Sequence, residues 1–89
     1  MVLKIKIKKM GESKTPFYVH KGDSGVDLFA TEDYLLAPME RKLIGTGIMI
    51  AIPYGYEAQI RPKSGLALEH GISHANGIGT IDSCYRGEI

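Results

Sequence analysis

GTIDSCYRGEI, residues 79–89, is a β-prone stretch in which a carboxylate, Asp82, directly follows the apolar Ile81. The pattern predicts a strand with Asp82 near its start. The last residues, Gly-Glu-Ile, carry no turn or capping signal. Because a strand needs hydrogen-bonded neighbours, we expect the sheet partners of Tyr85 to Ile89 to be missing or to come from another chain.

Short strand-like segments separated by turn signals precede this stretch. A helix is predicted only at residues 64–71, with Ser64 as its N-cap and Gly71 past its end. The Asn76–Gly77 pair is typical of a hairpin turn, and Gly55 marks a further turn. The pattern predicts one all-β barrel or sandwich domain, residues 1–89. Its strand-like segments are residues 2–8, 26–30, 34–42, 43–52 and 56–61.

Size and composition limit the possible function classes. The chain has 89 residues, 44% hydrophobic and 24% charged, with a formal net charge of +1. This balance argues against a dominant attraction to nucleic acid or to a membrane surface. No apolar run is long enough to span a bilayer, and the N-terminus lacks a secretory signal. With Cys84 as its single cysteine, the chain is predicted to be a soluble cytoplasmic protein.

RPKSGLA, residues 61–67, combines a cation, a hydroxyl and a glycine. Lys63 and Ser64 offer phosphate-binding groups, and Gly65 lets backbone N–H groups approach a ligand closely. A helix starting here also favours an anion at its N-terminus. The alternative is an ordinary surface turn, because the same residue types dominate turns.

Two aspartates lie beside apolar residues. Asp82 has the setting of a group that takes a proton from water, and Tyr85 has a ring that stacks on a planar ligand. Asp27, within SGVDLFA at residues 24–30, has the character of a carboxylate that holds Mg²⁺ bound to substrate phosphates. The alternatives are a turn or edge position for Asp82 and the solvated strand face for Asp27.

Three motifs occur in a specific order: SGVDLFA at 24–30, RPKSGLALEHGI at 61–72 and NGIGTIDSCYRGEI at 76–89. In this order they resemble the deoxyuridine triphosphatase (dUTPase) family of trimeric β-proteins, from about Asp23 to Ile89. The resemblance implies a distorted jelly-roll or β-clip barrel, incomplete at the C-terminus. It also implies a homotrimer with active sites shared between subunits.

The resemblance also implies a role for each matching residue. Asp82 is similar to the general base that orients water for attack on the α-phosphorus of dUTP, giving dUMP and pyrophosphate. Asp27 resembles the aspartate that holds Mg²⁺ through water. Lys63, Ser64 and Gly65 match the phosphate-binding motif.

The third motif is expected to read the nucleoside. Asn76, Ile78 and Gly79 lie where the family reads uracil, largely through backbone groups. Tyr85 resembles the tyrosine that packs against deoxyribose and leaves no room for a 2′-hydroxyl.

The sequence departs from the family pattern in three ways. Lys63 replaces the usual arginine, which keeps the charge but loses bidentate phosphate contact. Cys84 stands where an aspartate is frequent. The family's fourth motif and glycine-rich fifth motif lie beyond Ile89, so the chain is expected to be an N-terminal portion with weak activity or none.

Two alternatives to a dUTPase remain open at this stage. One is a dCTP deaminase-like enzyme of the same fold, although its arginine-serine-serine motif is not found. The other is a non-catalytic fragment that binds a nucleotide or a protein partner.

Overall fold

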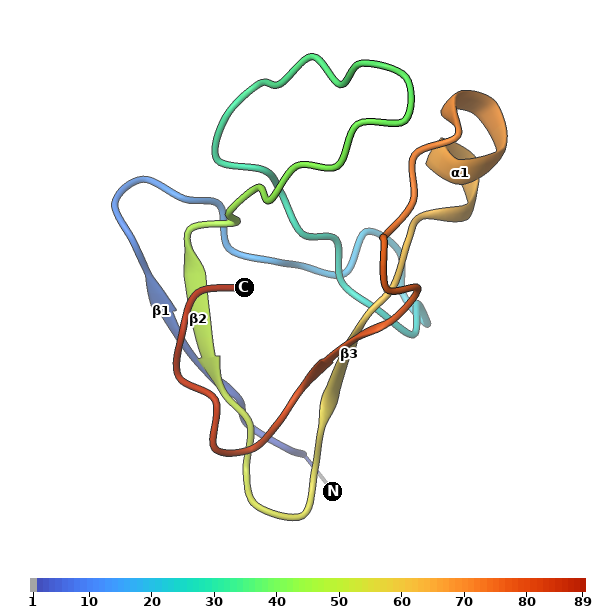
Figure 1. The fold of residues 1–89 in the computed structure, drawn as a ribbon. Coiled ribbons are helices and arrows are strands. Elements are labelled where there is room, and N and C mark those ends of the chain that lie inside the picture. Colours follow the sequence, from blue (N-terminus) through green and yellow to red (C-terminus); the bar gives the residue numbers. More distant parts are fainter. Residues whose placement is uncertain (1) are drawn as a thin grey trace. The chain divides into compact units, whose positions relative to one another are not determined.

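The computed structural model describes residues 2–89 (Figure 1). The chain divides into two compact units. The first unit comprises Met1–Ile50 with Arg86–Ile89, and the second comprises Ala51–Tyr85. The elements are β1 (Lys6–Lys9), β2 (Ile48–Ala51), β3 (Ala58–Ile60), α1 (Ser64–His70) and β4 (Gly79–Ile81). Short strands and one seven-residue helix confirm the predicted all-β class.

In the first unit, β1 pairs with β2, and the end of the chain pairs with the start of β2. Glu88 forms an antiparallel bridge with Met49, and the Ile89 N–H donates to the Ile48 carbonyl at 3.0 Å. The prediction that partners for the end of the chain lie elsewhere is therefore wrong for Glu88 and Ile89. The backbone of residues 46–49 supplies donors and acceptors for them within the same chain.

Two predicted strands are absent among the described residues, and the others are shorter than expected. Residues 26–30 and 34–42 contain no strand, because no neighbouring segment forms a ladder with them. The run from 43 to 52 becomes a strand only at Ile48. Gly47 precedes that strand with φ +71°, a left-handed conformation that interrupts an extended backbone.

A turn at Pro38 contains the one non-glycine residue of positive φ among residues 2–89. The Glu40 N–H donates to the Ala37 carbonyl at 3.0 Å, and Met39 has φ +66°. Pro38 at the second position and a positive φ at the third are the features of a type II turn, which favours glycine at the third position. The exposed Met39 thus holds a strained backbone without a packing gain, because its side chain is 99% exposed.

We expect Met39→Gly to stabilise the chain by about 0.5–1 kcal/mol. Relief of the left-handed strain, about 1–2 kcal/mol, exceeds the entropic cost of glycine in the unfolded chain. Urea unfolding measures the change. Leu35→Gly is the matched control, because Leu35 is 92% exposed and lacks a positive φ, so it should only destabilise. Equal losses from both substitutions would contradict the strain at Met39.

Side-chain hydrogen bonds also connect the two sides of the turn at Pro38. The Tyr34 hydroxyl donates to the Glu40 carboxylate at 2.6 Å, and that carboxylate also accepts the Ala37 N–H at 2.9 Å. The Tyr34 hydrogen bond, followed by that of Ala37, lowers the pKa of Glu40 from its ordinary 4.5. The same hydrogen bond raises the pKa of Tyr34 above 10.0. The contact therefore stabilises the loop most between those two ordinary values, and weakens as either group titrates beyond them.

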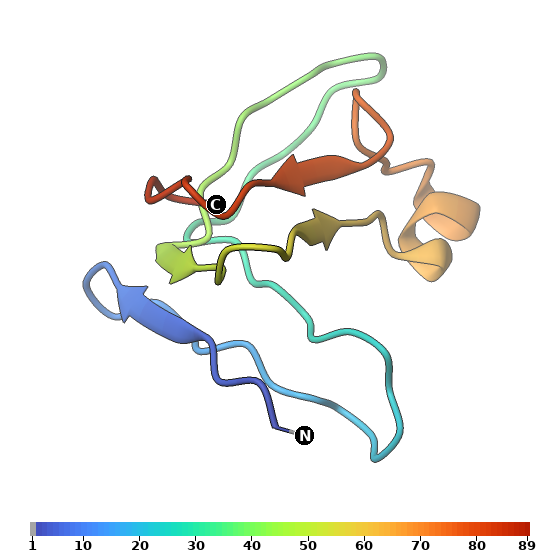
Figure 2. The same ribbon diagram turned by 90° about the horizontal axis from the view of Figure 1, so that it is seen from below.

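In the second unit, a turn leads into an antiparallel pair of strands. The predicted turn at Gly55 is confirmed by its φ of +90° and by the Tyr56 N–H, which donates to the Pro53 carbonyl at 3.1 Å. Strands β3 and β4 then lie side by side (Figures 1 and 2). Their register is Ala58↔Ile81, Gln59↔Thr80 and Ile60↔Gly79.

Helix α1 confirms the predicted helix and corrects its N-cap. The cap is Lys63, with extended φ and ψ and no side-chain capping bond, so Ser64 is the first helical residue. Gly71 ends the helix with φ +67°, as predicted, and its N–H donates to the Ala67 carbonyl. The left-handed glycine satisfies carbonyls that the helix end leaves unpaired.

Asn76–Gly77 lies in a turn rather than in a two-residue hairpin. The Gly77 N–H donates to the His74 carbonyl at 3.1 Å, and Gly77 has φ +77°. No strand directly precedes this turn, and β3 reaches β4 only through residues 61–78. The hairpin prediction is wrong because β4 pairs with β3 and not with the residues just before the turn.

The described part of the chain has a small core. Its buried hydrophobic residues are Ile48, Ile52 and Ile81. Large apolar side chains remain exposed in both units, among them Leu43 at 95%, Tyr54 at 96% and Leu68 at 86%. None of the helices in the described residues is both long and apolar enough to cross a membrane.

Candidate active site

The β3–β4 ladder fixes where the second unit carries its predicted site residues. Gly79 pairs with Ile60, so the turn that carries Asn76 and Ile78 enters the ladder at one end. Strand β3 leaves the ladder at that same end and continues through Pro62 into the Lys63–Gly65 segment. The phosphate-binding candidates and the candidate uracil-reading turn therefore adjoin the same end of one strand pair.

Asp82 adjoins the opposite end of this ladder. It directly follows β4, whose last residue, Ile81, pairs with Ala58. The prediction of Asp82 near the start of a strand is thus wrong, because the strand ends before it. The chain then turns, and the Tyr85 N–H donates to the Asp82 carbonyl at 3.1 Å. At about 3.3 Å per strand residue, the three-residue ladder displaces Asp82 by about 10 Å from Gly79.

The candidate residues of the second unit are accessible. Tyr85 is 43% exposed and Ile78 is 46% exposed, and Gly79 is half-buried within β4. A ligand or another chain can therefore reach these groups without unfolding the unit. The other exposed candidates are Lys63, Ser64, Gly65, Asn76 and Asp82.

Asp27, the candidate metal-binding residue, belongs to the first unit and is half-buried. Within residues 2–89, no three His, Cys, Asp or Glu side chains gather as a metal site. A single carboxylate nevertheless fits Mg²⁺ that is bound mainly by substrate phosphates and water. The Asp27 carboxylate is therefore compatible with an Mg²⁺ ion that is delivered together with a nucleotide.

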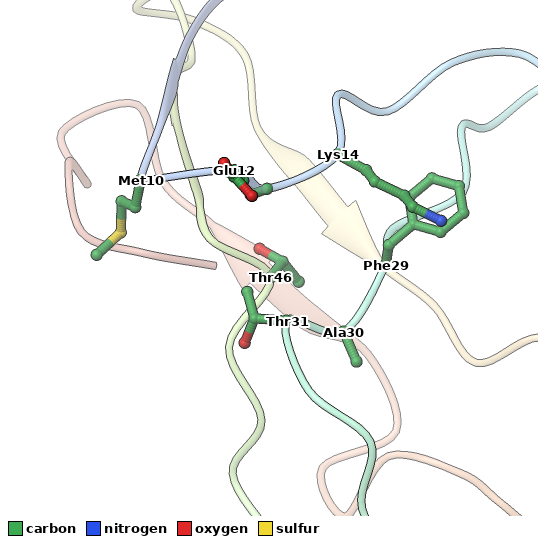
Figure 3. Close-up of a pocket in the computed structure, with 8 residues that line it drawn as sticks. Met10, Glu12, Lys14, Phe29, Ala30, Thr31 and Thr46 are labelled. Carbon is green, nitrogen blue, oxygen red and sulfur yellow. The ribbon is translucent and has the colours of Figure 1, made fainter.

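An open cavity of about 490 Å³ lies in the first unit (Figure 3). Lys14 crosses one wall, with its amine 5.0 Å from the centre of the Phe29 ring. Phe17 stacks on the same ring, with the ring centres 5.9 Å apart. None of the predicted site residues lines the cavity, whose walls are Met10, Glu12, Ser13, Lys14, Phe29, Ala30, Thr31 and Thr46.

Sequence reasoning also missed a set of backbone contacts at Gly45 and Gly47. The Glu88 carboxylate accepts the Gly47 N–H at 2.9 Å, across 41 residues of sequence. The available signal was the Gly-Thr-Gly triplet inside a β-prone run, since glycine in a strand marks a bend or a close backbone approach.

Comparison with protein families places nearly the whole chain in one of them. The dUTPase family model matches residues 5–89. A deoxyuridine 5′-triphosphate nucleotidohydrolase of Clostridium kluyveri is 60% identical over 78 residues, covering 88% of this chain and 54% of the relative. One of Trichodesmium erythraeum is 58% identical over 88 residues, covering 98% of this chain and 62% of the relative. The chain thus spans somewhat over half the length of these curated relatives.

Solved structures agree with the sequence comparison. A mutant dUTPase from phage phi11 of S. aureus, described with a structural Mg(II) ion, has a TM-score of 0.90 at 28% identity and matches 98% of this chain and 56% of that one. A mutant dUTPase of Staphylococcus bacteriophage 80alpha with dUpNHpp has a TM-score of 0.91 at 28% identity and matches 99% and 52%. Because family model, curated relatives and solved structures agree, this chain belongs to the dUTPase family and has the dUTPase fold over the part it covers.

Proposed function

We propose that this chain forms part of a magnesium-dependent enzyme that hydrolyses dUTP to dUMP and pyrophosphate, and that residues 1–89 are one dUTPase-like domain. Its family membership and the match to a dUTPase solved with dUpNHpp support this substrate. The observation that carries the proposal is the β3–β4 ladder, which separates Asp82 from the Lys63–Gly65 segment.

The active site is proposed to form between copies of the chain. Asp82 and Lys63–Gly65 adjoin opposite ends of the ladder in the second unit, so they serve one substrate best when they come from different copies. The exposed apolar side chains of the small-cored second unit, such as Tyr54 and Leu68, provide surface for contact between copies. We propose a homotrimer on this basis and on that of the family resemblance.

In this site, Asp82 accepts a proton from the water that attacks the α-phosphorus. A carboxylate beside a strand end can both orient a water molecule and take its proton. Lys63, Ser64 and Gly65 bind the phosphate chain through a cation, a hydroxyl and backbone N–H groups. Asp27 would hold Mg²⁺ through water, and the ion, when bound, would neutralise phosphate charge.

The segment around β4 is proposed to select the nucleoside. Asn76, Ile78 and Gly79 read uracil, largely through backbone groups, and Asn76 and Ile78 are exposed. Tyr85 packs against the deoxyribose, where its ring leaves no space for a 2′-hydroxyl.

The proposal is tested by measuring pyrophosphate release from dUTP by two proteins with Mg²⁺. One is the 89-residue chain, for which we expect weak or no turnover. The other, the completed chain, joins residue 89 to the C-terminal part of the Trichodesmium erythraeum enzyme beyond the matched region. We expect the completed chain to hydrolyse dUTP and to lose this activity when EDTA removes the metal.

Two outcomes contradict the proposal. A folded, trimeric completed chain that releases no pyrophosphate rules out the assigned activity. Turnover by the 89-residue chain equal to that of the Trichodesmium erythraeum enzyme rules out the need for further segments. Release of ammonia from dCTP by the completed chain would instead favour a dCTP deaminase-like enzyme, and nucleotide binding without turnover would favour a binding fragment.

Tyr85→Ala in the completed chain should weaken discrimination between dUTP and UTP by about tenfold or more, because the space for a 2′-hydroxyl opens. The measurement is the ratio of kcat/KM for the two nucleotides. Tyr18→Ala is the control, since Tyr18 is a 62% exposed tyrosine outside the three motifs. Unchanged selectivity in Tyr85→Ala would remove Tyr85 from the sugar pocket.

A further inference from the structure

A row of three polar side chains lies along β3 in the second unit. Glu57, Gln59 and Arg61 are all exposed, whereas the two residues between them are half-buried. Since side chains alternate across a strand, the three lie on the same, solvent-facing side of β3. The row ends directly before Pro62 and thus adjoins Lys63–Gly65, the segment that the proposed function assigns to the phosphates.

Two hydrogen bonds connect the members of this row. The side-chain amide of Gln59 donates to the Glu57 carboxylate at 3.0 Å, and its carbonyl oxygen accepts an N–H of the Arg61 guanidinium at 2.7 Å. An ionised carboxylate only accepts hydrogen bonds and a guanidinium only donates them. The two neighbours therefore determine which way the Gln59 amide faces, and they hold its oxygen toward Arg61.

Gln59 also separates the two charges of the row. A guanidinium that bonds directly to a carboxylate forms an ion pair, whereas Arg61 bonds to a neutral amide oxygen. A guanidinium carries five N–H donors in a planar fork, and the bond to Gln59 uses one of them. The Arg61 side chain is thus oriented by a bond that leaves its positive charge and further donors for an anion.

Arg61 lies close to Lys63 along an extended backbone. Pro62 restricts Arg61 to an extended conformation, and Lys63 is itself extended, with φ −81° and ψ 126°. The Cα atoms of Arg61 and Lys63 are at most about 7 Å apart, so the long arginine side chain has the length to reach an anion that contacts Lys63. A lysine amine acts as a point charge, whereas a guanidinium binds two phosphate oxygens at once. Arg61 is therefore placed to make the bidentate contact that Lys63 does not make.

We propose that Arg61 is a second phosphate-binding cation of the dUTPase site, held in position by Gln59 and Glu57. This inference rests on the proposed function and adds one binding residue and two positioning residues to it. Arg61 binds the phosphate chain beside Lys63 through paired N–H groups. Gln59 orients the guanidinium, and Glu57 orients the Gln59 amide.

The first test measures the affinity of the completed chain for dUpNHpp and for deoxyuridine, which has no phosphate, by calorimetric titration. Arg61→Gln should weaken dUpNHpp binding by about tenfold or more, because charge-assisted hydrogen bonds to phosphate are lost. Deoxyuridine binding should stay within about twofold. Arg41→Gln is the matched control, since it makes the same change in charge at an exposed arginine outside the three motifs, and it should leave both affinities unchanged.

Two further variants separate bidentate contact from charge. Arg61→Lys keeps the charge but loses the planar fork, so it should weaken dUpNHpp binding less than Arg61→Gln does. It also guards against a variant that fails to fold, and parental affinity in it would overturn the proposal. Lys63→Arg, added to Arg61→Gln, returns a guanidinium to the phosphate chain and should recover most of the lost affinity. Parental dUpNHpp affinity in a folded Arg61→Gln variant, or equal losses for dUpNHpp and deoxyuridine, would also overturn the proposal.

Glu57→Ala and Glu57→Gln test the positioning role at constant charge. Both remove the carboxylate charge, which by itself strengthens binding of a nearby anion. Only Glu57→Gln keeps an acceptor oxygen for the Gln59 amide. Glu57→Ala should therefore bind dUpNHpp about threefold more weakly than Glu57→Gln does, as expected for the loss of one hydrogen bond. Equal affinities of the two variants would contradict the positioning role of Glu57 and Gln59.

The same titrations distinguish failure of this inference from failure of the proposed function. A completed chain that binds dUpNHpp but releases no pyrophosphate from dUTP contradicts the proposed function, and the affinities of the Arg61 variants still decide the role of Arg61. A completed chain that hydrolyses dUTP, with parental affinity in Arg61→Gln, overturns only the role of Arg61. A folded completed chain that does not bind dUpNHpp overturns both.

Discussion

Asp82→Asn in the completed chain is expected to lower kcat for dUTP by about a thousandfold, within the range lost when a general base is removed. Asparagine keeps the size and the hydrogen-bonding oxygen of aspartate but does not accept a proton from water. Nucleotide binding should change little, because the phosphate and uracil contacts are assigned to other residues. Steady-state pyrophosphate release and titration with dUpNHpp measure the two effects separately.

The matched control for Asp82→Asn is Asp33→Asn, which makes the same chemical change at an exposed position outside the three motifs. It should leave kcat within about twofold, as is usual for surface substitutions away from a site. Near-normal turnover in Asp82→Asn, or loss of binding with unchanged turnover per bound site, would contradict the assignment of Asp82 as the base.

Gly47→Ala is expected to destabilise the 89-residue chain by about 2–5 kcal/mol. A residue with a side chain at φ +71° incurs left-handed strain of about 1–2 kcal/mol. Its Cβ would also lie 2.5 Å from the Ser13 Cβ and 2.9 Å from the Thr31 Cγ2, and such overpacking costs about 1–3 kcal/mol more. Urea unfolding, followed by circular dichroism, measures the loss.

Gly11→Ala separates these two contributions to the Gly47 effect. Gly11 has nearly the same backbone conformation, with φ +67°, but a Cβ there meets no atom within 4 Å. Its substitution should therefore cause only the strain, about 1–2 kcal/mol. Equal losses of stability at Gly11 and Gly47 would show that the crowding around Gly47 has no energetic effect.

Local chemistry was predictable where a few neighbouring residues determine the structure. Gly71 ends α1 because a left-handed glycine satisfies the final carbonyls, and the sequence places glycine directly after the helical stretch. The turn at Gly55 follows from the same preference. Within the strand-like segment 56–61, a strand forms at Ala58–Ile60, where Ala58 and Ile60 are less exposed than Gln59.

Long-range pairing was not predictable from the same patterns. Residues 26–30 have strand-like alternation, yet a strand requires a neighbour at the right distance, and local sequence does not specify one. Glu88 pairs with Met49 across 39 residues, so no short-range signal marks that bridge. The location of Asp82 after β4 was not predictable for a similar reason. Pairing with β3, rather than local propensity, decides that β4 ends at Ile81.

The candidate site was predictable as a set of motifs but not as a geometry. The resemblance of the motifs to the dUTPase family implies that Asp82 and the Lys63–Gly65 segment belong to one site. Only the register of β3 and β4 shows that they adjoin opposite ends of the same strand pair. That register depends on cross-strand contacts between residues 58–60 and 79–81, which the motifs do not encode.

The opposite placement of Asp82 and Lys63–Gly65 on one ladder has a genetic consequence. If each active site takes Asp82 from one copy and the phosphate-binding residues from another, a defective copy impairs its neighbour's active site as well as its own. When a variant without Asp82 and a variant without the phosphate-binding residues are co-expressed, some active sites in the mixed assemblies would be intact. A single inactive allele would conversely be partly dominant over the normal one.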